Sequence, residues 1–311
     1  MNEKKIIIIA GPTASGKTSF AINLAKEIDG IVINADSLQV YKENPIISAQ
    51  PTAKERQDVP HFLFGYVMGD EKYDIARWIK NVCEIIAHSD KPIILVGGTG
   101  FYLKHLIFGL SSIPEIPDED RDNFRTLAKE VGAINFHKLL KEVDPVSADK
   151  IEPNNIKKVL RAYEVLKITG YPLDYWQKNN LKYFPLSSFR MIILQPDREI
   201  LYRNCNQRFL DMLGAGVLEE VKFLIDQNYN LETGIMKSHG VPELRNYLAG
   251  DWSLNQATEK SQQVVRNYAK RQTTWFKHQF NHPDLLSYVA ENPNEEFCEI
   301  LEQCKLFLRS V

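Results

Sequence analysis

The chain has 311 residues, of which 44% are hydrophobic and 25% are charged, and its formal net charge is −2. This composition is ordinary for a soluble enzyme, and the length predicts one large domain or two smaller ones. No stretch approaches transmembrane length, and the apolar run near the start is too short for a signal peptide, so we expect a cytoplasmic protein without membrane contact. The four cysteines form no C-x-x-C pair, which excludes the usual patterns of a zinc site or a disulfide framework.

The first functional signal is a Gly-rich turn between an expected strand and an expected helix. Residues 5–10 (KIIIIA) are a short apolar run, residues 11–18 read GPTASGKT, and a helix-forming stretch follows. This matches the phosphate-loop pattern G-x-x-x-x-G-K-[ST] in the context that it requires. Backbone N–H groups and Lys17 would bind phosphate oxygens, and the Thr18 hydroxyl could hold Mg²⁺. The expected diphosphate- or nucleotide-binding residues are Gly11, Pro12, Thr13, Ala14, Ser15, Gly16, Lys17 and Thr18.

Two further expected strands end in candidate site residues. Residues 30–35 lead into Asp36, and residues 91–96 lead into a GGTG turn that contains Thr99. Ligands of open parallel sheets bind beyond the carboxyl ends of the strands, so both side chains should face the phosphate loop. Asp36 could be a magnesium ligand, a general base toward an acceptor, or simply a cap of the following turn. Between these strands we expect a loop-like segment over residues 42–73 and an amphipathic helix over residues 74–88.

The middle of the chain has a different character. Prolines punctuate charged, helix-periodic stretches between about residues 109 and 185, including 119–131 and 135–143. In residues 155–166, three basic residues lie opposite an apolar face, which fits either a solvated helix or a binding surface. We expect a helical insertion into the sheet domain that can close over a substrate.

The last part of the chain returns to the sheet and then becomes helical. We expect a strand over residues 189–194 and a helix over 198–213 that carries Arg203 and Arg208, either as a phosphate clamp or as surface ion-pair residues. A looser glycine-containing stretch follows. Residues 253–279 are expected to form one long helix with basic and aromatic residues interleaved, a pattern of RNA contact if it is not simply core and solvated surface. Residues 256–283 hold five basic residues and one acidic residue, whereas residues 284–311 hold two basic and six acidic residues.

Five segments together resemble one protein family. GPTASGKT, NADSLQVY, VGGTGFYLKHL, QRFLDMLGAGVLEEV and YAKRQTTWF are similar, in order and spacing, to motifs of the bacterial tRNA dimethylallyltransferases, also called tRNA isopentenyltransferases or the IPP transferase family. The similarity extends from about residue 5 to residue 279. Two segments depart from the family pattern, SAQPTAKE after the second strand and SHGVPE near His239, and any contact carried over to these segments is left open.

The resemblance implies a fold and a reaction. The fold would be α/β, with a P-loop kinase-like parallel sheet core flanked by helices (residues 1–110 and 186–311) and a mostly helical insertion domain (residues 111–185) that contacts tRNA. The reaction would transfer the dimethylallyl group of dimethylallyl diphosphate, with Mg²⁺, to the exocyclic amine N6 of the adenosine at position 37. This adenosine lies 3′-adjacent to the anticodon in tRNAs that read codons beginning with U. The partner would be the tRNA anticodon stem–loop; we expect no obligate protein partner and a monomer.

The resemblance also implies roles for individual residues. Asp36 would accept the amine proton, Thr99 would lie near the amine, Arg208 would stabilise the leaving diphosphate, and Thr18 would bind the metal. The residues expected to contact tRNA are Asp36, Ser37, Leu38, Gln39, Arg121, Lys157, Lys158, Val159, Leu160, Arg161, Lys270, Arg271, Gln272, Trp275 and Lys277.

Two other functions use the same loop. A small-molecule kinase would need the loop, an Asp at the second strand end and lid arginines for phosphoryl transfer from ATP. The basic, aromatic-containing helix near the end of the chain favours RNA over a small metabolite. A regulatory NTPase is the second alternative, but KPIILVGGTG ends in glycines and lacks the strand-terminal Asp that would support hydrolysis.

Overall fold

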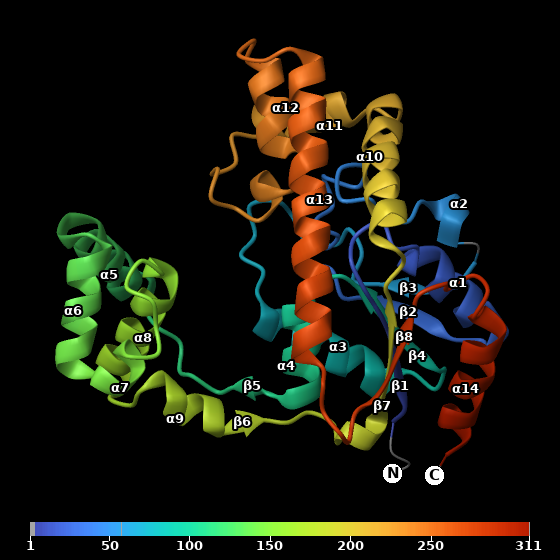
Figure 1. The fold of residues 1–311 in the computed structure, drawn as a ribbon, viewed down its shortest axis with the longest axis horizontal. Helices are drawn as coiled ribbons and strands as arrows, with labels where there is room; N and C mark the ends of the chain where they lie inside the picture. Colours follow the sequence, from blue (N-terminus) through green and yellow to red (C-terminus); the bar gives the residue numbers. More distant parts are fainter. Residues whose placement is uncertain (1–3, 57, 311) are drawn as a thin grey trace. The chain divides into compact units, whose positions relative to one another are not determined.

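The core of the protein is one parallel β-sheet (Figure 1). The computed structural model describes residues 4–56 and 58–310. Within them, six strands lie in the order β3-β2-β4-β1-β7-β8, and every neighbouring pair is parallel. All carboxyl ends therefore share one edge of the sheet. The bounds are β1 Ile6–Ala10, β2 Ile31–Asn34, β3 His61–Phe62, β4 Ile93–Gly97, β7 Phe189–Leu194 and β8 Leu286–Ala290.

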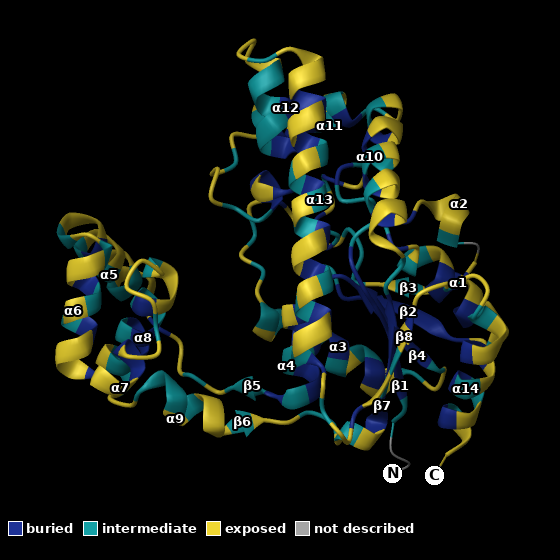
Figure 2. Cartoon of the chain, in the orientation of Figure 1, coloured by how far each residue is buried: buried dark blue, intermediate teal, exposed yellow. Residues whose placement is uncertain are grey.

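The central strand explains why the sheet forms where it does. Strand β1 consists of four isoleucines and an alanine, all fully buried, and Ile8 pairs with Leu95 on one side and Met191 on the other. A continuous apolar run of this kind is typical of a parallel strand that is covered on both faces. Helices α1 (Lys17–Glu27) and α14 (Phe297–Arg309) share a buried apolar cluster with residues of the sheet. Figure 2 shows the inner strands β1, β2, β4 and β7 as the buried layer of this unit.

Helices α3 (Ile75–His88) and α4 (Gly100–Phe108) follow the segments that lead out of β3 and β4. Asp74 caps α3 by accepting from the Arg77 N–H, as the expected helix over residues 74–88 requires. Trp78 of α3 is fully buried, donates its indole N–H to the Asn34 carbonyl at 2.8 Å and stacks on Tyr102 of α4. These contacts fix the ends of β2 and β4, which carry Asp36 and Thr99.

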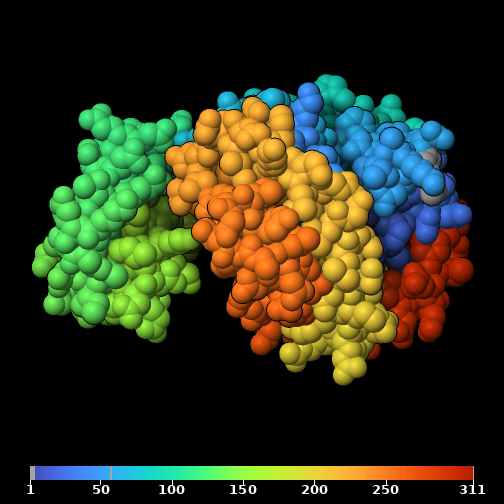
Figure 3. Space-filling model, turned by 90° about the horizontal axis from the view of Figure 1, so that it is seen from above, coloured from blue at the N-terminus to red at the C-terminus, as the bar shows by residue number. Residues whose placement is uncertain are grey.

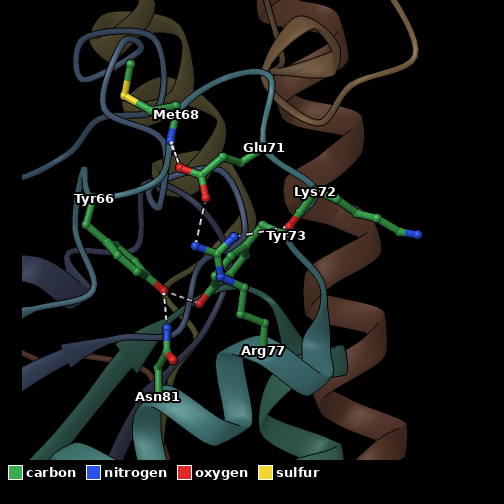
Figure 4. A network of polar contacts seen from close by, with 7 residues as sticks. All are labelled: Tyr66, Met68, Glu71, Lys72, Tyr73, Arg77 and Asn81. Atoms are coloured by element: carbon green, nitrogen blue, oxygen red, sulfur yellow. Dashed lines mark hydrogen bonds and ion pairs between the residues drawn. The ribbon is translucent and has the colours of Figure 1, made fainter. Parts of the chain in front are cut away.

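The segment before α3 is irregular, as expected, but its side chains tie it down. Among its described residues it contains one short helix, α2 (Ala53–Arg56), besides β3. Figure 4 shows how its last part attaches to α3: Arg77 pairs with Glu71 at 2.8 Å, and Asn81 donates to the Tyr66 hydroxyl at 3.0 Å. Tyr66 in turn shares a hydrogen bond with Tyr73. The loop is thus held by this polar network together with backbone hydrogen bonds, such as the one from the Lys42 N–H to the Val67 carbonyl at 2.9 Å.

Four helices after β7 form a second apolar cluster. They are α10 (Arg198–Gly214), α11 (Val217–Asp226), α12 (Val241–Leu248) and α13 (Leu254–Gln279). The expectation of a loose stretch after residue 213 was wrong for α11, whose Val217, Val221 and Leu224 pack in this cluster, whereas residues 227–240 are mostly turns. Figure 3 shows these segments, coloured yellow to orange, packed side by side. Helix α13 begins with a capping box at Ser253 and Gln256, which stabilises its start.

The insertion is a compact unit of its own, from Phe108 to Tyr183. Its limits lie within three residues of those expected for the insertion domain. It contains α5 (Asp118–Val131), α6 (Ala133–Val143), α7 (Pro145–Ala148), α8 (Ile156–Thr169), α9 (Leu173–Lys178) and a small antiparallel pair, β5 (Leu110–Ser111) with β6 (Asn180–Leu181). Its core is formed by apolar residues of α5, α6 and α8 around Phe136. None of the helices in the described ranges is long and apolar enough to cross a membrane.

Candidate active site at the carboxyl edge of the sheet

The ends of β1 and β2 and the helices α10 and α13 meet around one small cavity of about 40 Å³. The parallel arrangement of the strands places their carboxyl ends together, as the sequence predicted. The cavity has a charged side, with Asp36 and Arg208, and an apolar side. Its lining residues are Thr13, Asp36, Leu38, Ile47, Ser48, Cys205, Arg208, Phe209, Met212, His239, Val265 and Tyr268. Arg203, the other arginine of the expected clamp, is exposed.

The phosphate loop holds its positive charge in a desolvated position. Lys17 Nζ donates to the Pro12 carbonyl at 2.5 Å, and the Arg208 guanidinium donates to the Thr13 hydroxyl. Burial lowers the pKa of Lys17 to about 7, an effect that Asp36 opposes and Arg208 reinforces. Burial also lowers the pKa of Arg208. A bound anion would stabilise the charged forms of Lys17 and Arg208, which have lost hydration through burial. The electrostatics of the loop therefore favour binding of a diphosphate group.

Asp36 fills one of the roles that the sequence left open, the cap of the following turn. Its Oδ1 accepts the Leu38 N–H at 2.9 Å, which caps the following turn. Its own N–H donates to Asn34 Oδ1, and the fully buried Asn34 amide also donates to the carbonyls of Asp36 and Leu63. The turn bond uses only one carboxylate oxygen, so the capped Asp36 can still present its other oxygen to the cavity that it lines.

Thr99 lies at the centre of a hydroxyl network. Its Oγ1 accepts the Ser37 N–H at 2.9 Å and donates to Ser37 Oγ at 3.2 Å. Burial and the charge of Asp36 raise the pKa of the nearby Tyr268 phenol, and Arg271 and Thr99 oppose that shift. The two strand ends that carry Asp36 and Thr99 are therefore joined directly, through Ser37.

Helix α13 approaches the GGTG turn closely because Gly98 and Gly100 have no side chains. A Cβ on Gly98 would lie 2.4 Å from Gln272 Nε2, and one on Gly100 would lie 2.3 Å from the Trp275 ring. The Gln272 side chain accepts the Thr13 N–H at 2.8 Å and donates to the Gly98 carbonyl at 2.7 Å. It therefore clamps the phosphate loop to the GGTG turn. The prediction that Gln272 contacts tRNA needs correction, because its side chain is only 5% exposed and both ends are occupied.

Sequence reasoning did not assign a role to two aromatic residues of the cavity, Tyr268 and His239. Their rings pack with centroids 4.2 Å apart. The position of His239 is fixed by its neighbour Ser238, which accepts a hydrogen bond from the Asn44 amide at 3.0 Å in the buried interior. Burial lowers the pKa of His239, while Asp36 raises it and Arg271 lowers it further. The one sequence feature that pointed to His239 was the unusual SHGVPE segment. In the structure this segment places His239 in the cavity that Asp36 also lines.

The outer side of α13 carries the expected basic residues. Lys270, Arg271 and Lys277 are exposed, and Trp275 is partly buried. A shallow groove of about 550 Å³ runs along this side, lined by Asn267, Lys270, Arg271, Thr274, Trp275, His278 and Gln279. Arg271 lies over the Tyr268 ring, and Lys104 lies over the Trp275 ring. Basic and aromatic side chains therefore lie together beside the cavity that Tyr268 lines.

The basic residues of the insertion differ in their surroundings. Lys157 and Lys158 at the start of α8 are exposed, whereas Arg161 faces the buried carboxylate of Glu164 at 4.0 Å. Burial raises the pKa of Glu164, and the nearby charges of Arg161, Arg121 and Arg125 oppose that shift. The expected tRNA contact by the side chain of Val159 needs correction, because that side chain is fully buried in the core of the insertion.

These features define a class of protein. A parallel sheet whose first strand runs into GPTASGKT, with desolvated cations around the loop and a carboxylate at the next strand end, is a phosphate-binding α/β fold of the P-loop type. The basic outer side of α13 is a feature beyond phosphate binding alone.

Comparison with known proteins identifies the family. The sequence profile of IPP transferases matches residues 39–279, and that of isopentenyl transferases matches residues 4–64. The tRNA dimethylallyltransferase of Ehrlichia chaffeensis is 41% identical over 92% of this chain and 94% of its own. The chain belongs to the IPP transferase family.

Solved structures agree with this assignment. The tRNA isopentenylpyrophosphate transferase of Bacillus halodurans is 30% identical, with a TM-score of 0.70 over 98% of this chain and 97% of its own. A eukaryotic dimethylallyltransferase described as acting on tRNA is 28% identical, with a TM-score of 0.81 over 97% of this chain and 78% of its own. Both likenesses extend over nearly the whole chain, the insertion included.

Proposed function

We propose that this protein is a tRNA dimethylallyltransferase, which moves the dimethylallyl group of dimethylallyl diphosphate to N6 of the adenosine on the 3′ side of the anticodon. The observation that carries the proposal is the single cavity that joins an anion-binding loop, through Arg208 and Thr13, to the carboxylate of Asp36. Names of relatives and structural neighbours support the same reaction. The protein would act in the cytoplasm as a monomer.

The leaving group would bind at the phosphate loop. An allylic carbon releases diphosphate readily once the negative charge that develops on the phosphate oxygens is stabilised. Lys17, Arg208 and the loop N–H groups are placed for this task, and the Ser15 hydroxyl, which has no partner within the described ranges, is a further donor beside the loop. The apolar residues of the cavity, among them Ile47 and Phe209, would exclude water from the allylic carbon.

Mg²⁺ fits this loop. The ion usually binds through one or two protein oxygens, with substrate phosphates and water completing its shell. The described residues hold no cluster of three His, Cys, Asp or Glu side chains that could bind a metal ion. Thr18 follows Lys17 at the start of α1, and its hydroxyl would hold the ion together with the diphosphate. Its contribution would be additional positive charge on the leaving group.

The acceptor amine would meet Asp36 and Thr99. Asp36 would take the proton that the amine loses as the N6–carbon bond forms, and the Thr99 hydroxyl would orient the amine. The amine of an adenine that is stacked in an anticodon loop cannot reach Asp36 at the carboxyl edge of the sheet, so the base would be flipped out of the loop. The basic outer side of α13 and the exposed lysines of α8 would bind the RNA backbone, with Trp275 available for stacking.

A transfer assay tests the proposal. Radiolabelled dimethylallyl diphosphate is incubated with anticodon stem–loops that carry either adenosine or another nucleoside beside the anticodon. We expect label only on the adenosine-containing RNA. If no label appears while ATP is consumed with a small metabolite, the kinase alternative is correct and Asp36 acts on a hydroxyl instead.

A further inference from the structure

A turn at residues 45–49, which we call the Ile47 turn, forms part of the apolar side of the cavity. Ile47 and Ser48 both line the cavity, and Ile47 is only 6% exposed. The Gln50 N–H donates to the Pro45 carbonyl at 2.9 Å, which closes the turn on itself. These residues belong to neither a helix nor a strand. The position of the turn in the cavity therefore depends on the side chains that hold it from outside.

The carboxylate of Glu220 holds the start of the Ile47 turn from helix α11. Its Oε2 accepts the Ile46 N–H at 2.7 Å, and its Oε1 accepts the Ile47 N–H at 2.8 Å. Burial raises the pKa of the Glu220 carboxyl, and the bonds from Ile47 and Ile46 oppose that shift. A carboxylate that binds two consecutive N–H groups fixes their orientation as well as their distance. Glu220 therefore determines where the backbone of Ile47 lies.

The amide of Gln39 holds the other end of the turn. Its Nε2 donates to the carbonyls of Ser48 and Ala49, at 3.0 and 2.8 Å. Ala49 has a φ of 54°, in the left-handed region that residues other than glycine rarely adopt. Such a conformation persists only where surrounding contacts stabilise it. Gln39 and Glu220 thus hold the turn from opposite ends, through its carbonyl and N–H groups.

The side chain of Ile47 packs at a crowded point of the structure. A Cβ on Gly240 would lie 2.9 Å from Ile47 Cδ1 and 2.9 Å from Phe209 Cε2, which is too close for a carbon atom. Phe209 and Met212 also line the cavity, and both are buried. The apolar side of the cavity is therefore closed by tightly packed side chains, with no space for further carbon atoms unless Ile47 moves.

We propose that the Ile47 turn limits the length of the prenyl group that the cavity accepts, and that Glu220 and Gln39 are positioning residues that keep Ile47 in place. This inference rests on the proposed function. With the diphosphate at the phosphate loop, the dimethylallyl group would extend toward the apolar side of the cavity. A geranyl group, which is longer by one prenyl unit, would overlap with Ile47. A wall that is held rigidly rejects the longer group, whereas a wall that can shift accommodates it.

A comparison of two donors tests the proposal. Transfer to one adenosine-containing stem–loop is measured with dimethylallyl diphosphate and with geranyl diphosphate, so any change in RNA binding cancels in the ratio of the two kcat/KM values. Glu220→Gln keeps the size of the side chain, but its amide oxygen can accept only one of the two N–H groups securely. The preference for dimethylallyl diphosphate should fall about tenfold, the usual size of discrimination by an apolar pocket. Ile47→Ala should lower it at least as much.

Three further variants separate the possible outcomes. Glu219→Gln removes the same charge from an exposed neighbouring position of α11 and should leave the ratio unchanged. The double variant of Glu220→Gln and Ile47→Ala should prefer dimethylallyl diphosphate no less than Ile47→Ala alone, because both changes act on the same wall. Gln39→Met releases the other end of the turn and should lower the ratio in the same direction, which tests the proposal even if Glu220→Gln does not fold.

An unchanged ratio in Glu220→Gln, or in Gln39→Met where Glu220→Gln does not fold, would overturn the proposal. Equal losses with both donors would also overturn it, because Glu220 would then support the fold without setting the length of the donor. Absence of label transfer from dimethylallyl diphosphate by the wild-type protein, by contrast, would reject the proposed function itself.

Discussion

Helices α13 and α8 both carry basic side chains on an exposed face, yet the polar side chains that they bury have different partners. The inner side of α13 buries polar groups, among them Gln272, whose hydrogen bonds reach the phosphate loop and the GGTG turn. The inner side of α8 buries Val159 and Ala162 in the apolar core of the insertion, and its buried carboxylate, Glu164, faces Arg161 of the same helix. A change inside α13 should therefore alter the chemistry, whereas a change on the outside of either helix should alter RNA binding alone.

The largest effect is expected from removal of the Asp36 carboxylate, which lines the cavity. Asp36→Ala should lower turnover by about 10²–10⁴, the usual contribution of a general base. Binding of an anticodon stem–loop, measured by filter retention, should stay within a fewfold of wild type, because the basic faces of α13 and α8 are unchanged. Asp36→Asn is the matched variant, since it keeps the turn bond to the Leu38 N–H while removing the base. Weak RNA binding with normal turnover at saturating RNA would refute the assignment.

The second test concerns the clamp on the inner side of α13. Gln272→Ala should lower the free energy of unfolding by about 2–3 kcal/mol, because the Thr13 N–H and the Gly98 carbonyl lose their partner in a buried position. Gln263→Ala, on the exposed side of the same helix, should change it by less than about 0.5 kcal/mol. Urea unfolding measures both. Equal effects of the two substitutions would show that the clamp contributes no more than surface contacts do.

Such long-range contacts mark the limit of what the sequence alone could predict. The phosphate loop, Asp36 and Thr99 were predictable because each directly follows an apolar strand, and parallel strands place their ends together. Gln272 was misassigned because an amide between Arg271 and Lys277 looks like part of a solvated basic face. Its burial depends on glycines more than 170 residues away in the chain.

The same reasoning explains the elements that were missed. Strand β8 lies at the edge of the sheet, with Leu286 and Val289 exposed, so it lacks the continuous apolar pattern of a buried parallel strand. Tyr268 was noticed only as an aromatic residue in a basic helix. Its position beside His239 and Thr99 results from the packing of α12 and α13 and leaves no local signature.

The third test uses the pH dependence of pyrophosphate binding to probe Lys17 in the phosphate loop. The pKa of Lys17 is about 7 in the free protein, and a bound diphosphate would raise it again. The complex then holds more protons than the free protein, so affinity for pyrophosphate should rise as pH falls from about 9 to about 7 and level off below that. Calorimetry should show proton uptake in this range. Lys17→Met should remove this component, leaving only the titration of the ligand, and an unchanged pH profile would contradict the assignment.

The smallest effects are expected on the outer faces, where charge acts through screened contacts with phosphates. Lys270→Ala on α13 and Lys158→Ala on α8 should each weaken stem–loop binding a fewfold and reduce the slope of log K against log salt by about one. Neither should change kcat at saturating RNA, because neither side chain lines the cavity. Lys80→Ala on α3 removes the same charge from an exposed position outside both basic faces and should leave the slope unchanged. A lower kcat for Lys270→Ala would show that the inner and outer sides of α13 are coupled. If Lys80→Ala also reduced the slope of log K against log salt by about one, binding would depend on overall charge and not on these two faces.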